Sequence, residues 1–215
     1  MAEALRALPV LELTSPPLRP DHGVIVTMVS EKARVLDVGC GEGHLLTLLQ
    51  RERAVRARGF DLNQNAVNAC VAKGITAVQG DADRDLSAFP DGAFDYVIFS
   101  KTIQMMRRPR QVLKQAARIG ERIIVSFANY GQLGARLRFL QQGRVSRPRG
   151  ISAHWAETDL IHPCSVRDFA ELAADMHLRI ERAVPLTRGH PGAPFAKSLW
   201  RANLFADEAV FVLTT

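Results

Sequence analysis

The feature that most constrains this chain is an apolar run that leads directly into three glycines at alternate positions. Residues 34–46 read RVLDVGCGEGHLL, in which Gly39, Gly41 and Gly43 follow the apolar run. A short apolar run that ends in turn residues is typical of a buried strand, and the leucines after Gly43 have the spacing of a helix. The sequence therefore predicts a strand, a tight glycine turn and a helix.

Strand-like and helix-like segments alternate along the rest of the chain. The apolar patterns predict strands at residues 33–39, 54–61, 75–81, 94–100 and 121–127, and helices at 43–52, 63–74 and 110–120. After a helix at 165–176, the segments 178–186 and 207–215 read as an antiparallel pair. Strands joined by helices form a parallel sheet covered on both faces. We expect the α/β class: a doubly wound, mostly parallel, seven-stranded sheet with an antiparallel C-terminal strand.

The length and the patterning predict one domain. Residues 19–215 carry all the predicted elements, and a chain of 215 residues is within the usual size of a single α/β domain. Residues 1–18 are expected to form a poorly ordered N-terminal segment. Asp21 is expected to be the N-cap of a short helix that packs on the edge of the sheet.

The composition and the N-terminal sequence indicate where the protein is located and which partners it lacks. No apolar run approaches the ~18 residues of a membrane span, and the N-terminal residues lack the pattern of a secretion signal. The cysteines, Cys40, Cys70 and Cys164, are widely scattered, which fits neither a disulfide framework nor a metal site. We therefore expect a cytoplasmic protein with reduced thiols, no metal and no membrane partner.

A net charge of +6 raises the question of a nucleic-acid partner. The arginines are spread along the whole chain, however, and no aromatic residues are interleaved with their densest groups. Nucleic-acid binding is therefore disfavoured, and the basic residues fit a solvated surface.

The acid before the glycine turn indicates which ligand the turn holds. Dinucleotide folds use G-x-G-x-x-G and direct a helix N-terminus at a pyrophosphate. Here Asp37 stands two residues before Gly39 in the pattern D-x-G-x-G-x-G. A carboxylate repels a diphosphate and attracts an ammonium group. A ligand with an amino-acid end and a nucleoside end is favoured, and S-adenosylmethionine has both.

Two further acids stand where such a ligand needs them. Asp61 ends the second predicted strand and is placed to accept two hydrogen bonds from a ribose diol. Asp81, in QGDA after the third strand, can accept one from an adenine amino group. Phe94 and Asp95, which open the fourth strand, are expected to lie beneath the reacting end of the ligand.

A catalytic group is harder to identify. Methyl transfer from a sulfonium needs a proton acceptor only if the nucleophile must lose a proton. After the fourth strand the chain reads SKTIQMM, with no N-P-P-Y-like stretch, and Cys164 lies far downstream of the loop that holds a cytosine-type nucleophile. His162, Tyr130 and His154 are weak candidates, each of which is equally compatible with a solvated or backbone-bonded loop side chain. The catalytic residue therefore stays unknown.

The segments VLDVGCGEG, GFD, QGDA and FDYVIFS, within residues 30–128, resemble class I S-adenosylmethionine-dependent methyltransferases in sequence and in order. The resemblance implies a Rossmann-like sheet that binds S-adenosylmethionine or S-adenosylhomocysteine. The residues that we assign to the cofactor are Asp37, Gly39, Cys40, Gly41, Gly43, Asp61, Leu62, Asp81, Ala82 and Ser100.

Over residues 19–213 the chain also resembles the methionine biosynthesis protein MetW family. The likeness rests on LRPDH, the long stretch from GDADRD to SFANYG, IHPCSVRDF and ANLFADEAVFVL. Within it, Ser100, Thr102 and Gln104 follow the fourth strand, and SF-x-N supplies Ser126, Phe127 and Asn129. The chain departs from the family at Ala128, where a proline is usual, and at HWAETDLIH, where an aromatic-rich stretch is usual.

This second resemblance implies an accessory subunit that binds S-adenosylmethionine and works with a homoserine O-acyltransferase. Two alternatives stay open: a methyltransferase that acts on a small molecule, and a basic enzyme that modifies nucleic acid. The segments 143–150 and 139–143 are either a contact surface for a partner or a solvated loop and helix end.

Overall fold

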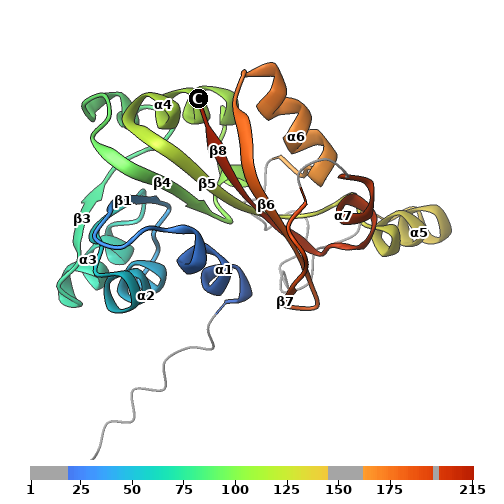
Figure 1. Ribbon diagram of the computed structural model, residues 1–215, viewed down its shortest axis with the longest axis horizontal. Coiled ribbons are helices and arrows are strands. Elements are labelled where there is room, and N and C mark those ends of the chain that lie inside the picture. The colour runs from blue at the N-terminus through green and yellow to red at the C-terminus, as the bar shows by residue number, and fades with distance from the viewer. Residues whose placement is uncertain (1–18, 145–161, 196–198) are drawn as a thin grey trace, which may run out of the picture.

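A single twisted sheet with helices on both faces organises the chain (Figure 1). The computed structural model describes residues 19–144, 162–195 and 199–215. The sheet has eight strands in the order β3-β2-β1-β4-β5-β8-β6-β7. The strands are β1 (Arg34–Val38), β2 (Arg56–Asp61), β3 (Thr76–Gln79), β4 (Phe94–Ser100), β5 (Gly120–Ala128), β6 (Arg179–Thr187), β7 (His190–Pro191) and β8 (Glu208–Thr214).

The first five strands are parallel, and β8 is antiparallel to both of its neighbours, β5 and β6. The helices are α1 (Pro20–Met28), α2 (His44–Arg53), α3 (Gln64–Ala72), α4 (Pro109–Ile119), α5 (Leu133–Gln142), α6 (Val166–Asp175) and α7 (Leu199–Phe205), with short 3₁₀ turns η1 (Asp85–Ala88) and η2 (Ile103–Met105).

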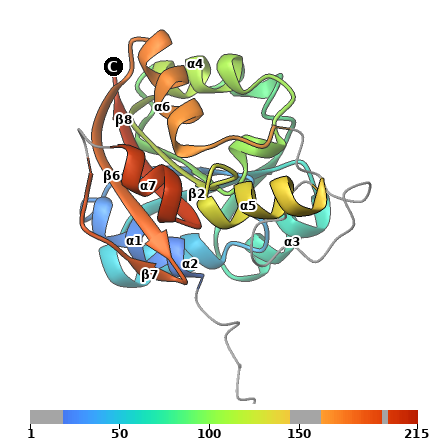
Figure 2. The same cartoon turned by 90° about the vertical axis from the view of Figure 1, so that its right-hand side faces the viewer.

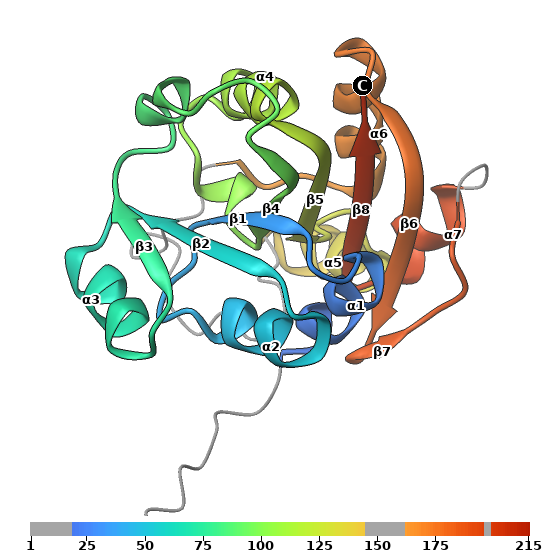
Figure 3. The same cartoon turned by 60° about the vertical axis from the view of Figure 1, so that its left-hand side comes forward.

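The helices form two layers, one on each face of the sheet. In Figure 3, α1, α2 and α3 lie on one side and α4 and α6 on the other. Alternate residues of a strand point to opposite faces, and in β4 Tyr96 and Ile98 join the core under α1 and α2, whereas Val97 and Phe99 join the core under α4 and α6. The second core is completed by an aromatic cluster with ring centroids 4.7–5.6 Å apart, made of Phe127, Phe169 and Phe211.

The predicted fold class is confirmed, with one difference in the strand count. All seven predicted strands are present, and the predicted pair at 178–186 and 207–215 forms the antiparallel pair β6 and β8. The eighth strand, β7, has two residues and pairs with the end of β6. It lies in a Gly/Pro-rich stretch, where no apolar alternation indicates a strand. Figure 2 shows α7 beside α5 at one side of the molecule, and α7 is also not predicted from the pattern.

Asp21 does not have the predicted role of helix N-cap. A helix is present, but it begins at Pro20, its N-cap is Arg19, and no side chain caps it. Asp21 is fully buried and accepts hydrogen bonds from the hydroxyls of Ser100 and Ser126 and from the guanidinium of Arg19. A buried carboxylate needs such partners, so these contacts across the fold decide its position.

Within the part of the chain that the structure describes, no helix has both the length and the hydropathy needed to span a bilayer. Residues 1–18, which we expect to be poorly ordered, lie outside the described residues.

Candidate functional site

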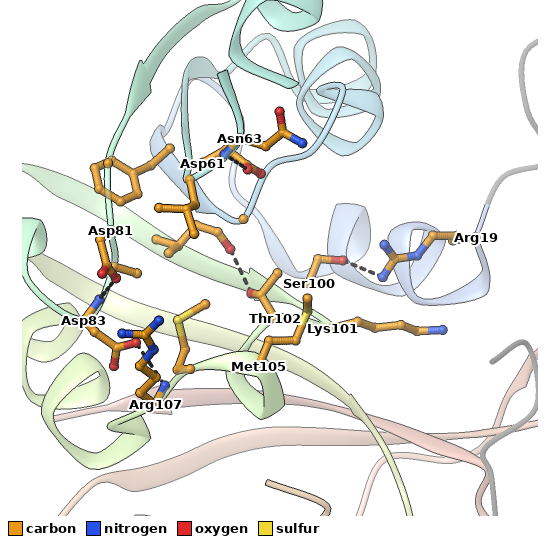
Figure 4. A pocket seen from close by; sticks show the side chains of 17 residues that line it. Arg19, Asp61, Asn63, Asp81, Asp83, Ser100, Lys101, Thr102, Met105 and Arg107 are labelled. Atoms are coloured by element: carbon orange, nitrogen blue, oxygen red, sulfur yellow. Dashed lines mark hydrogen bonds between the residues drawn. The ribbon is translucent and has the colours of Figure 1, made fainter. Parts of the chain in front are cut away.

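A cleft of about 980 Å³ opens where the parallel strands end (Figure 4). It is lined by Arg19 and by residues 38–39, 61–63, 80–83 and 100–102, which end or follow β1, β2, β3 and β4, together with parts of η2 and the segment after it. The strand order reverses at this place, since β1 lies between β2 and β4. Open α/β sheets bind their ligands at such a reversal, outside the carboxyl ends of the strands.

The glycine turn after β1 forms one wall of the cleft. Gly39 has a φ of +77°, and a Cβ at this position would lie 2.2 Å from Cγ2 of Thr102. Thr102 Oγ1 also donates to the carbonyl of Val38 at 2.8 Å. The absence of a side chain at Gly39 therefore lets the loop after β4 close against the turn. Gly41 has a φ of +52° and donates its N–H to Oδ2 of Asp61 at 2.8 Å.

Gly43→Ala is expected to destabilise the protein more than Gly41→Ala. Both glycines have a positive φ, which costs an alanine about 1–2 kcal/mol. Only at Gly43 would the new Cβ meet neighbours, with Cys70 Sγ and Ile75 Cδ1 each 2.9 Å away, and overpacking adds about 1–3 kcal/mol. Urea unfolding of the two variants measures the difference, and equal free energies of unfolding would show that Gly43 has no packing role.

Asp37 is a buried carboxylate with an oxygen that has no partner. It is 1% exposed, and none of the described groups hydrogen-bonds to its Oδ1. Burial raises the pKa of Asp37 from 3.8 to about 7, an effect that Arg19 opposes and the charges of Asp61 and Asp21 reinforce. It does not itself line the cleft, but it directly precedes residues 38–39, which do. A buried charge without a partner costs free energy. A cationic group of a ligand could supply the missing partner.

Asp61 ends β2 with both carboxylate oxygens oriented by the backbone. Oδ1 accepts the N–H of Asn63 at 2.9 Å, and Oδ2 accepts that of Gly41 at 2.8 Å. Each oxygen of an ionised carboxylate can accept more than one hydrogen bond, so both can also accept from a diol in the cleft. The next residue, Leu62, lines the cleft with a side chain that is 68% exposed, which offers an apolar surface to a nucleoside.

Asp81 and Ala82 line the same part of the cleft. Asp81 Oδ1 accepts the N–H of Asp83 at 3.0 Å, and the backbone N–H of Asp81 donates to Asp85 at 2.8 Å. Asp83 in turn accepts two backbone N–H groups at the start of α4. The acids of this loop are therefore held by backbone N–H groups, from within the loop for Asp81 and from the segment before α4 for Asp83, and Asp81 lines the cleft.

Three of the predicted cofactor residues have other contacts. Cys40 and Gly43, like Gly41, do not line the cleft: Cys40 Sγ lies 3.7 Å from Cys70 Sγ, and burial raises the pKa of both thiols. Ser100 does line the cleft, but its hydroxyl donates to Asp21. These residues support the turn and the end of β4 around the ligand site.

The expected position of Phe94 and Asp95 beneath the reacting end is wrong. Both residues open β4, so they lie at the amino end of the strand, whereas the cleft lies at the carboxyl end. Asp95 forms an ion pair with Arg34 at 2.6 Å, and this arginine lowers the pKa of the Asp95 carboxyl. The contact joins β1 to β4 at the amino ends of these two strands, away from the cleft.

The candidate catalytic residues lie outside the cleft or at its rim. Tyr130 follows β5 and does not line the cleft. His162 is exposed, and its Nε2 lies 3.3 Å from the carbonyl oxygen of Arg107, which does line it. His154 is outside the described residues. Among the described cleft-lining residues, the ionisable side chains are carboxylates, lysine and arginine, without a histidine, tyrosine or cysteine.

The motifs after β4 and β5 hold the neighbouring elements together. The amide of Gln104 donates to the carbonyl of Ala128 and accepts its N–H, both at 3.1 Å. The amide nitrogen of Asn129 donates to three carbonyls at the end of α7, and its oxygen accepts the N–H of Gly131 and that of Val166 at the start of α6. T-x-Q therefore joins the segment after β4 to β1 and β5, and the asparagine of SF-x-N holds α6 and α7.

Arg19, Thr102 and Asp83 are cleft residues that the reasoning from sequence did not assign to the ligand. The LRPDH and T-x-Q motifs contain the first two, but only the fold brings them to the glycine turn.

The sheet order, with antiparallel β8 between β5 and β6, and the cleft at the glycine turn define the class I S-adenosylmethionine-dependent methyltransferase fold. Solved methyltransferases of this class superpose on nearly the whole chain. One from Thermotoga maritima has a TM-score of 0.66 at 15% identity, with 91% of this chain and 87% of that one covered. One from Aquifex aeolicus has a TM-score of 0.61 at 14% identity, with 91% and 89% covered.

Within this class, the chain belongs to the family described as methionine biosynthesis protein MetW, whose model matches residues 19–213. The bifunctional methionine biosynthesis protein MetXA/MetW of Rhodopirellula baltica is 28% identical over 176 residues, 78% of this chain and 28% of that protein. A fatty-acid O-methyltransferase of Mycolicibacterium smegmatis is 36% identical over 103 residues, 46% of this chain and 37% of that protein. The chain thus spans well under half of the length of these two relatives.

Proposed function

We propose that the chain is an S-adenosylmethionine-binding accessory subunit of methionine biosynthesis, which works with a homoserine O-acyltransferase in the cytoplasm. The main support for this partnership is one relative, in which a MetXA part and a MetW part form a single polypeptide. Two functions joined in one chain in one organism are good candidates for association as separate chains in another.

The residues in and next to the cleft support S-adenosylmethionine as the proposed ligand. Asp37, with an unpaired buried oxygen, suits the ammonium group of S-adenosylmethionine, and the two oriented oxygens of Asp61 suit its ribose. Asp81 and Leu62 offer a hydrogen-bond acceptor and an apolar surface to the adenine. Gly39 keeps the turn free of a side chain between them.

The alternative is a methyltransferase that acts on a small molecule. The cleft, at about 980 Å³, is at the upper end of the usual range of about 300–1,000 Å³ for small-molecule sites. Two relatives are named for carboxylic acids, a fatty-acid O-methyltransferase and a trans-aconitate 2-methyltransferase. A carboxylate acceptor has no proton to lose, so it suits a cleft whose described lining offers Arg107 and Lys101. Formation of S-adenosylhomocysteine with a panel of acids tests this alternative.

Co-expression with the homoserine O-acyltransferase of the same organism tests the accessory role. We expect the two proteins to elute together in size-exclusion chromatography, and the rate of acyl transfer to rise severalfold when this chain is present. Separate elution together with an unchanged rate would refute the partnership.

The end of α5 offers a surface for that complex, since Phe139 and Leu140 are 57% and 81% exposed. Leu140→Glu is expected to reduce co-elution, whereas Val71→Glu, at another exposed apolar position on α3, is the control. Most of the second candidate segment, 143–150, lies outside the described residues.

An S-adenosylmethionine-binding subunit can also report the level of the pathway's end product. This requires that the ligand change the affinity for the acyltransferase, and the partner then changes the affinity for the ligand by the same factor. Titration of the complex with S-adenosylmethionine tests the idea, and unchanged assembly with unchanged activity would end it.

A further inference from the structure

A second cleft, with a volume of about 530 Å³, lies at the amino ends of the parallel strands. Its lining includes the first residues of β1, β2, β3 and β4, which are Arg34, Arg56, Thr76 and Phe94. The cleft at the glycine turn lies at the carboxyl ends of the same strands. Because β2 has six residues, its two ends are about 17 Å apart. The second cleft is therefore a separate site.

Three arginines line the second cleft, and they lie on one face of the sheet. Arg34 and Arg56 are register partners on β1 and β2, and Arg58 follows Arg56 by two positions. Neighbouring strands are about 4.8 Å apart, and alternate residues of one strand are about 6.6 Å apart. Like charges at these spacings repel one another. An anion bound between the arginines would offset this repulsion.

Arg34 is fixed by an acid, whereas the other two arginines are not. Nε and Nη2 of Arg34 donate to Asp95 Oδ1 at 3.0 and 2.6 Å, and its backbone N–H donates to Oδ2 at 2.7 Å. The side chains of Arg56 and Arg58 are exposed and form no hydrogen bond or ion pair with any residue in the described ranges. None of the described residues that line the second cleft is acidic. Two guanidinium groups, each with five N–H donors, are therefore left for a ligand.

One wall of the second cleft is apolar. Phe89 lines it together with Pro90 and Ala93. The ring of Phe89 packs edge-to-face on the rings of Phe60 and Phe94, with centroids 5.8 and 5.5 Å away, and these contacts hold it in place. Small-molecule sites usually combine apolar walls with a few polar groups in a volume of about 300–1,000 Å³. The second cleft has both properties.

We propose that the second cleft binds a small organic anion, in which a group with two negative charges is attached to an apolar ring. Arg56 and Arg58 donate to the anionic group, because the guanidinium fork matches the oxygens of a phosphate. The ring lies against Phe89. A nucleic acid is disfavoured, since it needs a basic stripe along the surface rather than a single cleft. The site does not depend on the proposed binding of S-adenosylmethionine.

Titration calorimetry with phenyl phosphate at pH 8 tests the proposal. The phosphate group is a dianion at this pH, since its second pKa is about 6. At equal ionic strength, we expect the wild type to bind phenyl phosphate about tenfold more tightly than benzoate, which has one charge. Inorganic phosphate, which has no ring, is also expected to bind more weakly than phenyl phosphate.

Substitutions of single arginines locate the site. Arg56→Gln and Arg58→Gln are each expected to weaken the binding of phenyl phosphate about tenfold, as the loss of a charge-assisted hydrogen bond implies. Arg107→Gln removes an equal charge from the cleft at the glycine turn and should keep the wild-type affinity. Without ligand, the Tm of Arg56→Gln and Arg58→Gln should equal or exceed that of the wild type at low salt, because one of three like charges is removed.

Four results would overturn the proposal. The first is a wild type without saturable binding of phenyl phosphate, and the second is an unchanged affinity in the double variant Arg56→Gln/Arg58→Gln. The third is an equal loss of affinity in Arg107→Gln, which would mean attraction by net charge alone. The fourth is tighter binding of a short DNA duplex than of phenyl phosphate, lost in the same two variants, which would assign these arginines to a nucleic acid.

Discussion

Asp37→Asn is expected to make the ligand-free protein more stable than the wild type at pH 8, and to weaken its binding of S-adenosylmethionine. In the folded protein, burial raises the pKa of Asp37 from 3.8 to about 7. The folded state therefore holds this proton more tightly than the unfolded state. As the pH rises from about 4 to about 7 the wild type loses stability, by at most ~4 kcal/mol at 1.36 kcal/mol per pH unit.

The asparagine variant has no charge to bury, so its stability does not fall over this pH range for this reason. Its advantage in the free energy of unfolding is expected to be small at pH 4, to grow up to about pH 7 and to level off by pH 8. Urea unfolding at several pH values measures it. Asp175→Asn, at a carboxylate with 66% exposure, is the control and should show no such trend. A constant difference across the pH range would mean that Asp37 is not the group that titrates.

The same carboxylate makes ligand binding depend on pH. An ammonium group favours the ionised form of Asp37, so below about pH 7 the affinity of the wild type for S-adenosylmethionine should fall by up to about tenfold per pH unit. At pH 8, Asp37→Asn is expected to bind about 10- to 100-fold more weakly, because a charge-assisted contact is lost. If Asp37 is a buried charge that binds the ligand, the same variant should gain stability and lose affinity for S-adenosylmethionine.

Asp61→Ala is expected to abolish the thermal stabilisation by S-adenosylmethionine. At a ligand concentration 100 times the Kd, the wild type should gain about 2.7 kcal/mol, which raises the Tm of a protein of this size by about 5–10 °C. Removal of the Asp61 carboxylate takes away both acceptors for the ribose. The two charge-assisted hydrogen bonds together lower the affinity by about two orders of magnitude or more, so the shift should vanish at the same concentration.

The variant also loses the hydrogen bonds from Gly41 and Asn63, so its own Tm without ligand is the reference. Asp175→Ala, at an exposed carboxylate of α6, removes the same charge away from the cleft and should keep the full shift. An equal shift in Asp61→Ala and the wild type would refute the ribose assignment.

Local patterns in the sequence predict most of the fold. Alternation of apolar residues identifies the strands with errors of one or two residues, and β4 is predicted without error at Phe94–Ser100. The glycines after β1 and the acid at the end of β2 are also local, since each stands next to its strand. Asp95 shows the limit of this reasoning, because a residue in the right strand can lie at the wrong end of it.

The sequence by itself determined the α/β class, the position of the glycine turn and the acids at the strand ends, because each depends on neighbours a few residues apart. Only the tertiary structure decided that Arg19 enters the cleft. Asp21 is fully buried and meets Ser100 and Ser126, which are 79 and 105 residues away along the chain. A buried charge takes the position where the folded chain supplies its donors, and no periodicity in the sequence encodes that meeting.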